Sequence, residues 1–543
     1  MNNNYEEFTE SQAKTLEKYV TSITSPIFVL RNLPEVIKGA LFSRYSRSSL
    51  GLRTLLLKEF ISNNDEASFE AIVGAEANSE SPQQQTAAIK RAQNFYDRIL
   101  DGYGDDSIGE LGGAHLAIEN ISMLAAKAIE DSRIGGSPLE KSTRYIFFDQ
   151  KVRGEYLYYR EPILLTSAYR DIYIDTCNML FETYSELIPP LTSILEKSFP
   201  RSQEISQVAY NAALRAKVLD GLRGLLPAGT LTNMGVFGNG RFFESLLHRL
   251  HSQNLAELQE IGRRSQEELT KVIPSFVRRA DVAHRTHHGY QHFHNAMGAQ
   301  LRLLAEQHCT FDSGETESRV RLIAHQPDDI YQVAAALLYA HSNKGLLELT
   351  QYCRQLPDEE LARILDGACS ARENRRHKSP RALEHAEFTF EILSDFGVYR
   401  DLHRHRMLTQ ERQLLTCDYG YYTPPEIIGT ELEEPYHQSM NRAKEVFDVI
   451  AQELPEEAQY VVPMAFNVRW YFHINLRGLQ WLCELRSGAA GHPNYRRIAQ
   501  EMARQTIAAQ PAYERFFKFV DFDGYEIGRL DQEQRNVDKA KRE

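Results

Sequence analysis

Residues 400–406 read Arg-Asp-Leu-His-Arg-His-Arg and form the densest basic cluster in the chain. If this stretch is helical, Arg400, His403 and Arg404 share one face. Guanidinium groups bind phosphate and carboxylate oxygens through paired hydrogen bonds, so such clusters are typical of sites for anionic ligands. The alternative is a solvated basic helix face that pairs with acids elsewhere in the chain.

The composition around this cluster is that of a globular protein without nucleic-acid or membrane partners. The 543 residues carry a formal net charge of −12, and 42% of them are hydrophobic. Nucleic-acid and anionic-membrane binders are normally basic, and no apolar run approaches the ~20 residues that span a bilayer. The first residues, MNNNYEEFTESQAK, lack the basic and apolar parts of a signal peptide. The six cysteines have no CxxC spacing, so we expect a cytoplasmic protein.

Apolar periodicity predicts a helix-rich α+β fold. Spacings of three and four indicate helices within residues 10–60, 165–200, 241–272, 328–353 and 434–452. Short strands are predicted at Tyr145–Phe148, Gly154–Tyr159, Val320–Ala324 and Leu414–Asp418. The His-rich stretch at 283–298 reads as a connection between two halves. Its histidines have no spacing that joins them to carboxylates on one face, so we expect no metal site.

The sequence around the basic cluster resembles the flavin-dependent thymidylate synthase family. A His-x-Ser stretch, His377-Lys-Ser379, stands upstream, and a Phe-Thr-Phe stretch follows at 388–390. In the family, Arg-His-Arg opens the longer motif RHRxxSxxExSxR. Here the opening is intact as Arg404, His405 and Arg406, whereas the Glu, Ser and Arg of ExSxR are replaced by Arg412, Leu414 and Thr416.

The missing part of the motif occurs earlier in the chain. Residues 140–144 contain an intact ExSxR with Glu140, Ser142 and Arg144, while residues 130–133 read Glu-Asp-Ser-Arg where Arg-His-Arg would stand. The pattern Ile-Glu-Asn-Ile-Ser at 118–122 is echoed at 390–394, with an offset of 272 residues between Glu119 and Glu391. This offset is close to half of the 543-residue chain, so a tandem duplication is indicated.

A third echo lies near the end of each half. Asn239-Gly-Arg241, with Arg249 ten residues after Asn239, resembles Asn467-Val-Arg469, with Arg477 ten residues after Asn467. Arg223 stands in a stretch that resembles the family's Ala-Arg-x-x-Leu-Pro, and Gln459 replaces this arginine in the second half. We therefore predict two copies of the family fold, an N-terminal repeat at 1–290 and a C-terminal repeat at 291–543.

The two copies have lost complementary parts of the family motif. In the family, each active site is assembled from several subunits of a homotetramer, so the resemblance implies one composite site between the repeats and a homodimer of this chain. It assigns substrate binding to Glu140, Ser142, Arg144, Arg223 and Arg477. It assigns cofactor binding to His377, Ser379, Arg404, His405, Arg406 and Asn467, and catalytic positions to Ser142 and Arg404.

The resemblance also implies the reaction, which is methylation of dUMP with FAD as cofactor and with methylenetetrahydrofolate and NADPH as co-substrates. Asp401 departs from the family, which usually carries Gln there, so another uridine nucleotide or carbon donor stays open. So do a non-catalytic flavin- or nucleotide-binding protein and a helical scaffold. Individual residues have structural alternatives as well: Glu140 and Arg144 could form a helical ion pair, and Asn239 and Asn467 could cap or turn the chain.

Overall fold

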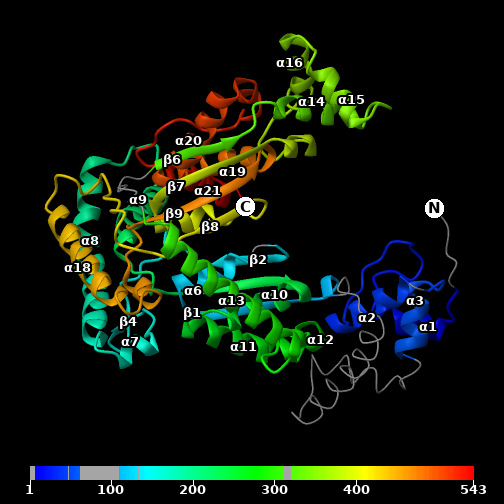
Figure 1. The fold of residues 1–543 in the computed structure, drawn as a ribbon, viewed down its shortest axis with the longest axis horizontal. Coiled ribbons are helices and arrows are strands. Elements are labelled where there is room, and N and C mark those ends of the chain that lie inside the picture. Colours follow the sequence, from blue (N-terminus) through cyan, green and yellow to red (C-terminus); the bar gives the residue numbers. More distant parts are fainter. Residues whose placement is uncertain (1–6, 47, 62–108, 133, 311–318, 543) are drawn as a thin grey trace. The chain divides into compact units, whose positions relative to one another are not determined.

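The computed structural model describes residues 7–46, 48–61, 109–132, 134–310 and 319–542 (Figure 1). Arg133, in the degraded part of the first motif, lies outside these residues. The chain divides into two compact units: Met1–Ile121, Ala128–Glu140 and Thr232–Phe311 form the first, and Ser122–Lys127, Lys141–Leu231 and Asp312–Glu543 form the second. Helices predominate over small sheets, which confirms the predicted α+β class.

The first unit is built on a three-stranded sheet. Its strand order is β1 (Gly113–Ser122), β5 (Leu231–Asn239), β2 (Gly136–Glu140), and β2 runs antiparallel to β5. Buried apolar positions of α10, including Phe242, Phe243 and Leu247, form part of its core. The helices of this unit are α1 (Glu10–Leu16), α2 (Glu35–Tyr45), α3 (Leu52–Leu55), α10 (Gly240–His251), α11 (Ala256–Val272), α12 (Pro274–Val277) and α13 (Arg285–His308), and α6 (Met123–Glu130) spans the division.

The second unit contains an antiparallel sheet of four strands. Its order is β6 (Arg319–His325), β7 (Glu387–Asp395), β9 (Asn467–Asn475), β8 (Thr409–Arg412). Alternate residues of β9 are buried, as expected for a strand with one face in the core. Two short strands, β3 (Lys151–Val152) and β4 (Glu155–Tyr156), form a hairpin. The helices are α7 (Pro162–Thr166), α8 (Arg170–Ser198), α9 (Gln207–Leu222), α14 (Asp329–Tyr339), α15 (Leu346–Cys353), α16 (Asp358–Gly367), α17 (Phe396–Leu402), α18 (Glu433–Ala451), α19 (Leu476–Arg486), α20 (Pro493–Ala509) and α21 (Leu530–Ala540).

Equivalent strand-to-helix corners give the correct register of the two repeats. Asn239 ends β5, and its Oδ1 accepts a 2.8 Å hydrogen bond from the Phe242 amide at the start of α10. Asn475 ends β9 and caps α19 in the same way, with 2.9 Å to the Gly478 amide. Asn475, and not Asn467, is therefore the counterpart of Asn239, 236 residues later. The predicted pairing of Asn239 with Asn467 was wrong because it matched a cap with the first residue of a strand.

The same offset relates two segments that pair about a local two-fold axis inside the second unit. Pro227 and Pro463 form an antiparallel bridge and are 236 residues apart. The Ala228 amide donates to the Val462 carbonyl at 2.8 Å, and the Met464 amide donates to the Leu226 carbonyl at 2.9 Å. Each bond is the image of the other under the 236-residue shift, so the repeats meet here as two symmetry-related copies.

The earlier parts of the repeats follow the predicted spacing to within one residue. Glu140 pairs with Met234 in the first sheet, and Arg412 pairs with Trp470 in the second, which reproduces the predicted 272 offset. At the starts of α6 and α17 the offset is 273, because Ser122 caps the Ala125 amide at 2.9 Å and Asp395 caps the Val398 amide at 2.9 Å. The predicted equivalence of Ser122 with Ser394 is therefore corrected by one residue.

The secondary-structure predictions were right for most helices and wrong for two strands. The strand predicted at Val320–Ala324 is part of β6, and 154–159 contains β4. Residues 145–148 and 414–418 form turns and irregular backbone. The segment predicted as a connection is helical instead, since α13 begins at Arg285 and runs through residue 290. None of the described helices combines the length and apolar character needed to cross a bilayer.

Candidate functional site

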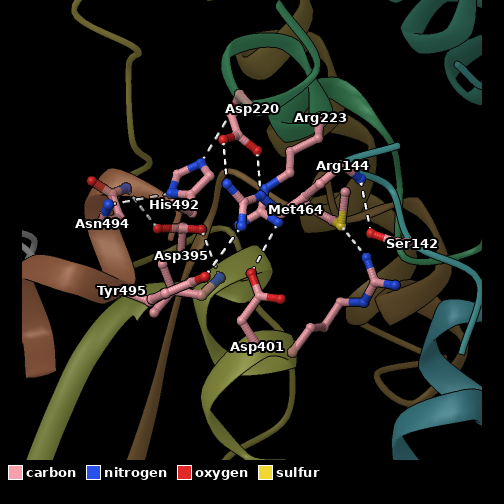
Figure 2. A network of polar contacts seen from close by, with 12 residues as sticks. Ser142, Arg144, Asp220, Arg223, Asp395, Asp401, Met464, His492, Asn494 and Tyr495 are labelled. Atoms are coloured by element: carbon pink, nitrogen blue, oxygen red, sulfur yellow. Dashed lines mark hydrogen bonds and ion pairs between the residues drawn. The ribbon is translucent and has the colours of Figure 1, made fainter. Parts of the chain in front are cut away.

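Arg144 lies at the centre of a buried polar network in the second unit (Figure 2). Its Nε and Nη2 each donate to one oxygen of the Asp220 carboxylate on α9, both at 2.6 Å. Its Nη1 donates at 3.1 Å to the hydroxyl of Tyr495 on α20. Burial alone raises the pKa of Asp220, but the Arg144 guanidinium outweighs it and the pKa lies below its usual value. Arg144 and Tyr495 thus join the first repeat to the second.

Arg223 makes a second ion pair between the repeats. It caps the C-terminus of α9 and donates from Nη1 to Oδ2 of Asp401, on α17, at 3.0 Å (Figure 2). Burial raises the pKa of Asp401, but Arg223 and Arg144 together hold it well below its usual value. Asp401, the departure from the family pattern, is therefore the counter-ion of Arg223. Within the described part of the chain, Nη2 of Arg223 is buried without a hydrogen-bond partner.

Three further residues hold the beginnings of α17 and α20 against this network. Oδ1 of Asp395 accepts a hydrogen bond from the Val398 amide at 2.9 Å, and its Oδ2 accepts one from the Asn494 side chain at 3.0 Å. His492 accepts from the Asn494 amide at Nδ1, so its Nε2, 3.3 Å from the Asp220 carbonyl, carries the proton. Burial lowers the pKa of His492 to about 3, which keeps the ring neutral.

A small pocket opens beside Arg144. It is lined by residues from α9, from the loop before α20, and from the C-terminal segment Tyr525–Arg529. Its free space is about 40 Å³, enough for roughly three water molecules. We call this the Arg144 pocket.

A larger hollow, of about 370 Å³, lies where the chain leaves α17. Arg404, His405 and Arg406 line it together with Trp481 and Arg486 of α19. Arg486 donates from Nε to Nε2 of His405 at 3.1 Å, and burial lowers the pKa of His405 well below its usual value, so this ring is neutral. The Trp481 side chain is 40% exposed. We call this hollow the Arg404 pocket.

Tyr495 connects the surroundings of the two pockets. Its ring centroid lies 5.6 Å from the guanidinium carbon of Arg144 and 5.7 Å from that of Arg486. Both distances are within reach of a cation–π interaction. The predicted nucleotide side and the predicted flavin side of the site therefore share one aromatic side chain.

Other predicted residues lie elsewhere. Arg477 pairs with Glu384 at 2.7 Å and donates to the Ser379 carbonyl at 2.8 Å. The remaining side chains make local contacts: Ser379 Oγ with Gln480 at 2.6 Å, His377 with Asn374 at 2.9 Å, and Asn467 Nδ2 with the Tyr419 carbonyl at 2.7 Å. Among the described residues, these four predicted residues line neither pocket.

The two remaining members of the first motif, Glu140 and Ser142, precede Arg144 in the sequence. Ser142 Oγ accepts a hydrogen bond from the Arg144 amide at 3.2 Å and so shapes the turn that carries Arg144. Glu140 is buried at the end of β2 and belongs to the first unit.

Sequence reasoning missed Asp220, His492, Tyr495 and Arg486. Asp220 had a weak signal, because it stands one helical turn before Arg223 and a buried arginine needs a counter-ion. The other three belong to no motif and reach the site only through the packing of α19 and α20.

Comparison with known proteins identifies relatives of two kinds. The sequence model of the family described as thymidylate synthase complementing protein matches residues 59–275 and 321–512. A UPF0159 protein of Chlamydia muridarum is 55% identical over 97% of this chain and 98% of its own length. A flavin-dependent thymidylate synthase of Thermotoga neapolitana is 25% identical over 26% of this chain and 72% of its own length. A solved structure of a UMP/dUMP methylase from Streptomyces cacaoi is 19% identical, covers 38% of this chain and 97% of its own, and has a TM-score of 0.29.

Proposed function

Since the chain belongs to the thymidylate synthase complementing protein family, we propose that it is a flavin-dependent methyltransferase of the thymidylate synthase type. Its substrate would be dUMP or a related uridine nucleotide. One observation carries the proposal: Arg144 and Arg223 of the first repeat meet α17 and α20 of the second repeat, and α17 leads directly into Arg404, His405 and Arg406. This supports the proposal for part of each retained motif, namely Arg144 and Arg223 of the first copy and Arg404, His405 and Arg406 of the second.

The Arg404 pocket fits the chemistry of FAD. Arg404, Arg406 and Arg486 supply guanidinium groups for a pyrophosphate, and Trp481 offers a partly exposed aromatic surface. Its size lies within the usual range of small-molecule sites. When bound, the flavin would supply hydride and methylene transfer, with methylenetetrahydrofolate as carbon donor and NADPH as reductant. The protein's part would be to orient the reactants and to neutralise their phosphates.

On the nucleotide side, Arg144 and Arg223 would bind oxygens of the uracil ring or of the phosphate. Both guanidinium groups are already held by carboxylates, Asp220 and Asp401. Fixed counter-ions pre-organise the donors, so little side-chain entropy is lost when the ligand binds. Nη2 of Arg223 is buried without a hydrogen-bond partner among the described residues, and Arg223 lines neither the Arg144 pocket nor the Arg404 pocket.

The test uses the purified full-length protein. The proposal expects a flavin absorption spectrum with one FAD per chain, and NADPH oxidation that depends on both dUMP and methylenetetrahydrofolate. Arg404→Ala should lose FAD, whereas Arg144→Ala should retain FAD and lose the response to dUMP. A protein that neither contains nor binds FAD would refute the proposal. The proposed homodimer is checked on the same sample by light scattering.

A non-catalytic nucleotide- and flavin-binding protein is the second candidate. It is favoured by the Arg144–Asp220 and Arg223–Asp401 ion pairs, which leave the arginines neutralised before any ligand arrives. Binding of FAD and dUMP without NADPH oxidation would select this candidate. Growth of a thymidine auxotroph that carries the gene would exclude it.

A further inference from the structure

The Arg144 pocket is closed on one side by a segment that lies beyond the family match. The match ends at residue 512, whereas Tyr525, Glu526, Ile527, Gly528 and Arg529 all line the pocket. The helix that follows, α21, packs against α9, and Gln534 accepts a 2.8 Å hydrogen bond from the Ser206 amide before α9. The helix that follows the segment is therefore anchored to α9, which supplies part of the pocket lining.

The backbone of this segment approaches the loop before α20 closely. A Cβ at Gly528 would clash with the carbonyl oxygen of Ala489, and Ala489 also lines the pocket. Only glycine permits this approach, because every other residue carries a Cβ. The close approach of Gly528 to Ala489 thus fixes where the next residue, Arg529, lies at the pocket.

The cations of the Arg144 pocket differ in whether a carboxylate already neutralises them. Arg144 pairs with Asp220 at 2.6 Å, Lys217 with Glu426 at 2.7 Å, and Arg496 with Asp521 at 3.6 Å. The remaining acid of the lining, Glu526, is exposed to solvent.

Arg529 is the cation without such a partner. It is 8% exposed, its Nη2 contacts the Tyr145 hydroxyl, and its guanidinium lies 4.3 Å from the centre of the Tyr145 ring. Among the described residues no carboxylate pairs with it, and its buried Nε has no hydrogen-bond partner. A buried positive charge without a counter-ion is costly, and a bound anion removes that cost.

We propose that Arg529 binds the phosphate group of the nucleotide, and that the C-terminal segment thereby adds a specificity-determining residue to the site. The free space of the pocket, roughly three water molecules, matches the size of a phosphate group. The pocket itself indicates only that the ligand carries an anionic group. That this group belongs to a nucleotide rests on the proposed function.

The test compares dUMP with deoxyuridine, which lacks the phosphate, by calorimetric titration of the full-length protein. Arg529→Gln should weaken dUMP binding by about 10- to 100-fold, the usual range for a charge-assisted hydrogen bond, and leave deoxyuridine binding unchanged. Arg529→Lys should keep most of the preference for dUMP, because it keeps the charge. Arg535→Gln is the matched control, since this arginine lies on α21 and outside the pocket lining.

Inorganic phosphate separates this inference from the proposed function. If the wild-type protein binds neither dUMP nor deoxyuridine, the proposed function fails. Thermal stabilisation by phosphate that Arg529→Gln abolishes would still support an anion site at Arg529. Unchanged dUMP binding in Arg529→Gln, equal weakening of both ligands, or phosphate stabilisation that persists in the variant would each overturn the inference.

Discussion

Arg223 and Gln459 occupy equivalent positions on the two sides of the local two-fold axis, and they use their side chains differently. Arg223 donates a hydrogen bond to Asp401 of the other repeat. Gln459 instead accepts a hydrogen bond from the Leu415 amide at 3.1 Å and donates one to the Glu456 carbonyl at 3.0 Å. Arg144 also differs from its counterpart, since the more exposed Thr416 bonds to the carboxylate and to the amide of Asp418, two residues away. One copy of the position carries a buried charge, and the other satisfies nearby backbone.

This difference is the one expected if the proposed ligand site uses the side of the axis that carries Arg223. A neutral residue that bonds to the backbone fills a buried position at a lower cost in folding free energy than an ion pair, because the ion pair must overcome the desolvation of both charges. On the other side of the axis, the neutral side chain of Gln459 bonds only to backbone groups among the contacts that the structure describes. The side with Arg223 keeps two desolvated ion pairs, which stability alone does not explain.

The largest expected effect comes from making the two sides alike. Arg223→Gln removes the paired counter-ion of Asp401, whose side chain is only 16% exposed, so we expect the free energy of unfolding to fall by about 3–5 kcal/mol. Urea unfolding measures the loss, and dUMP-dependent NADPH oxidation should disappear.

A double variant separates stability from function at this position. Arg223→Gln with Asp401→Asn removes both charges and should recover most of the lost stability without restoring activity. If the double variant regains activity, Arg223 serves only the fold and the contrast with Gln459 carries no functional meaning.

On the other side of the axis, Gln459→Ala should cost less. The variant leaves the buried Leu415 amide without its acceptor, and an unsatisfied group of this kind costs about 1–3 kcal/mol. NADPH oxidation should be unchanged once the protein is folded. A loss of activity as large as that of Arg223→Gln would show that both sides of the axis bind ligand.

Asp401→Asn and Gln459→Ala should also differ in how their loss of stability depends on pH. The pKa of Asp401 is lowered in the folded protein, so its charge stabilises the fold above the usual carboxyl pKa of 3.8 and loses this effect as the pH falls through the lower folded pKa. The destabilisation by Asp401→Asn should therefore be constant from pH 8 to about pH 5 and shrink in more acidic buffer. The effect of Gln459→Ala, which involves no charge, should not change over this range.

The motif residues could be named from the sequence, whereas their partners could not, for physical reasons. The resemblance to the family motif pointed to Arg144, Arg223 and Arg404, because a site for an anionic ligand needs several guanidinium groups. Asp220 and Tyr495 reach the site through helix packing, which no local pattern encodes. The apolar alternation of β7 and β9 is visible in the sequence, but neither segment was predicted as a strand. Asn467, predicted as a cofactor-binding residue, lies at the start of β9 and bonds to the Tyr419 carbonyl.

The smallest expected effect tests the register on which the comparison of the repeats depends. Asn239→Ala and Asn475→Ala each remove a helix N-cap, and each should lower the free energy of unfolding by about 1 kcal/mol. Asn239→Ser and Asn475→Ser are the matched controls, since serine also caps well and should restore most of the loss. Chemical denaturation monitored by circular dichroism provides the measurement. If serine rescues position 239 but not position 475, the two corners are not equivalent, the 236-residue register fails, and Gln459 is no longer the counterpart of Arg223.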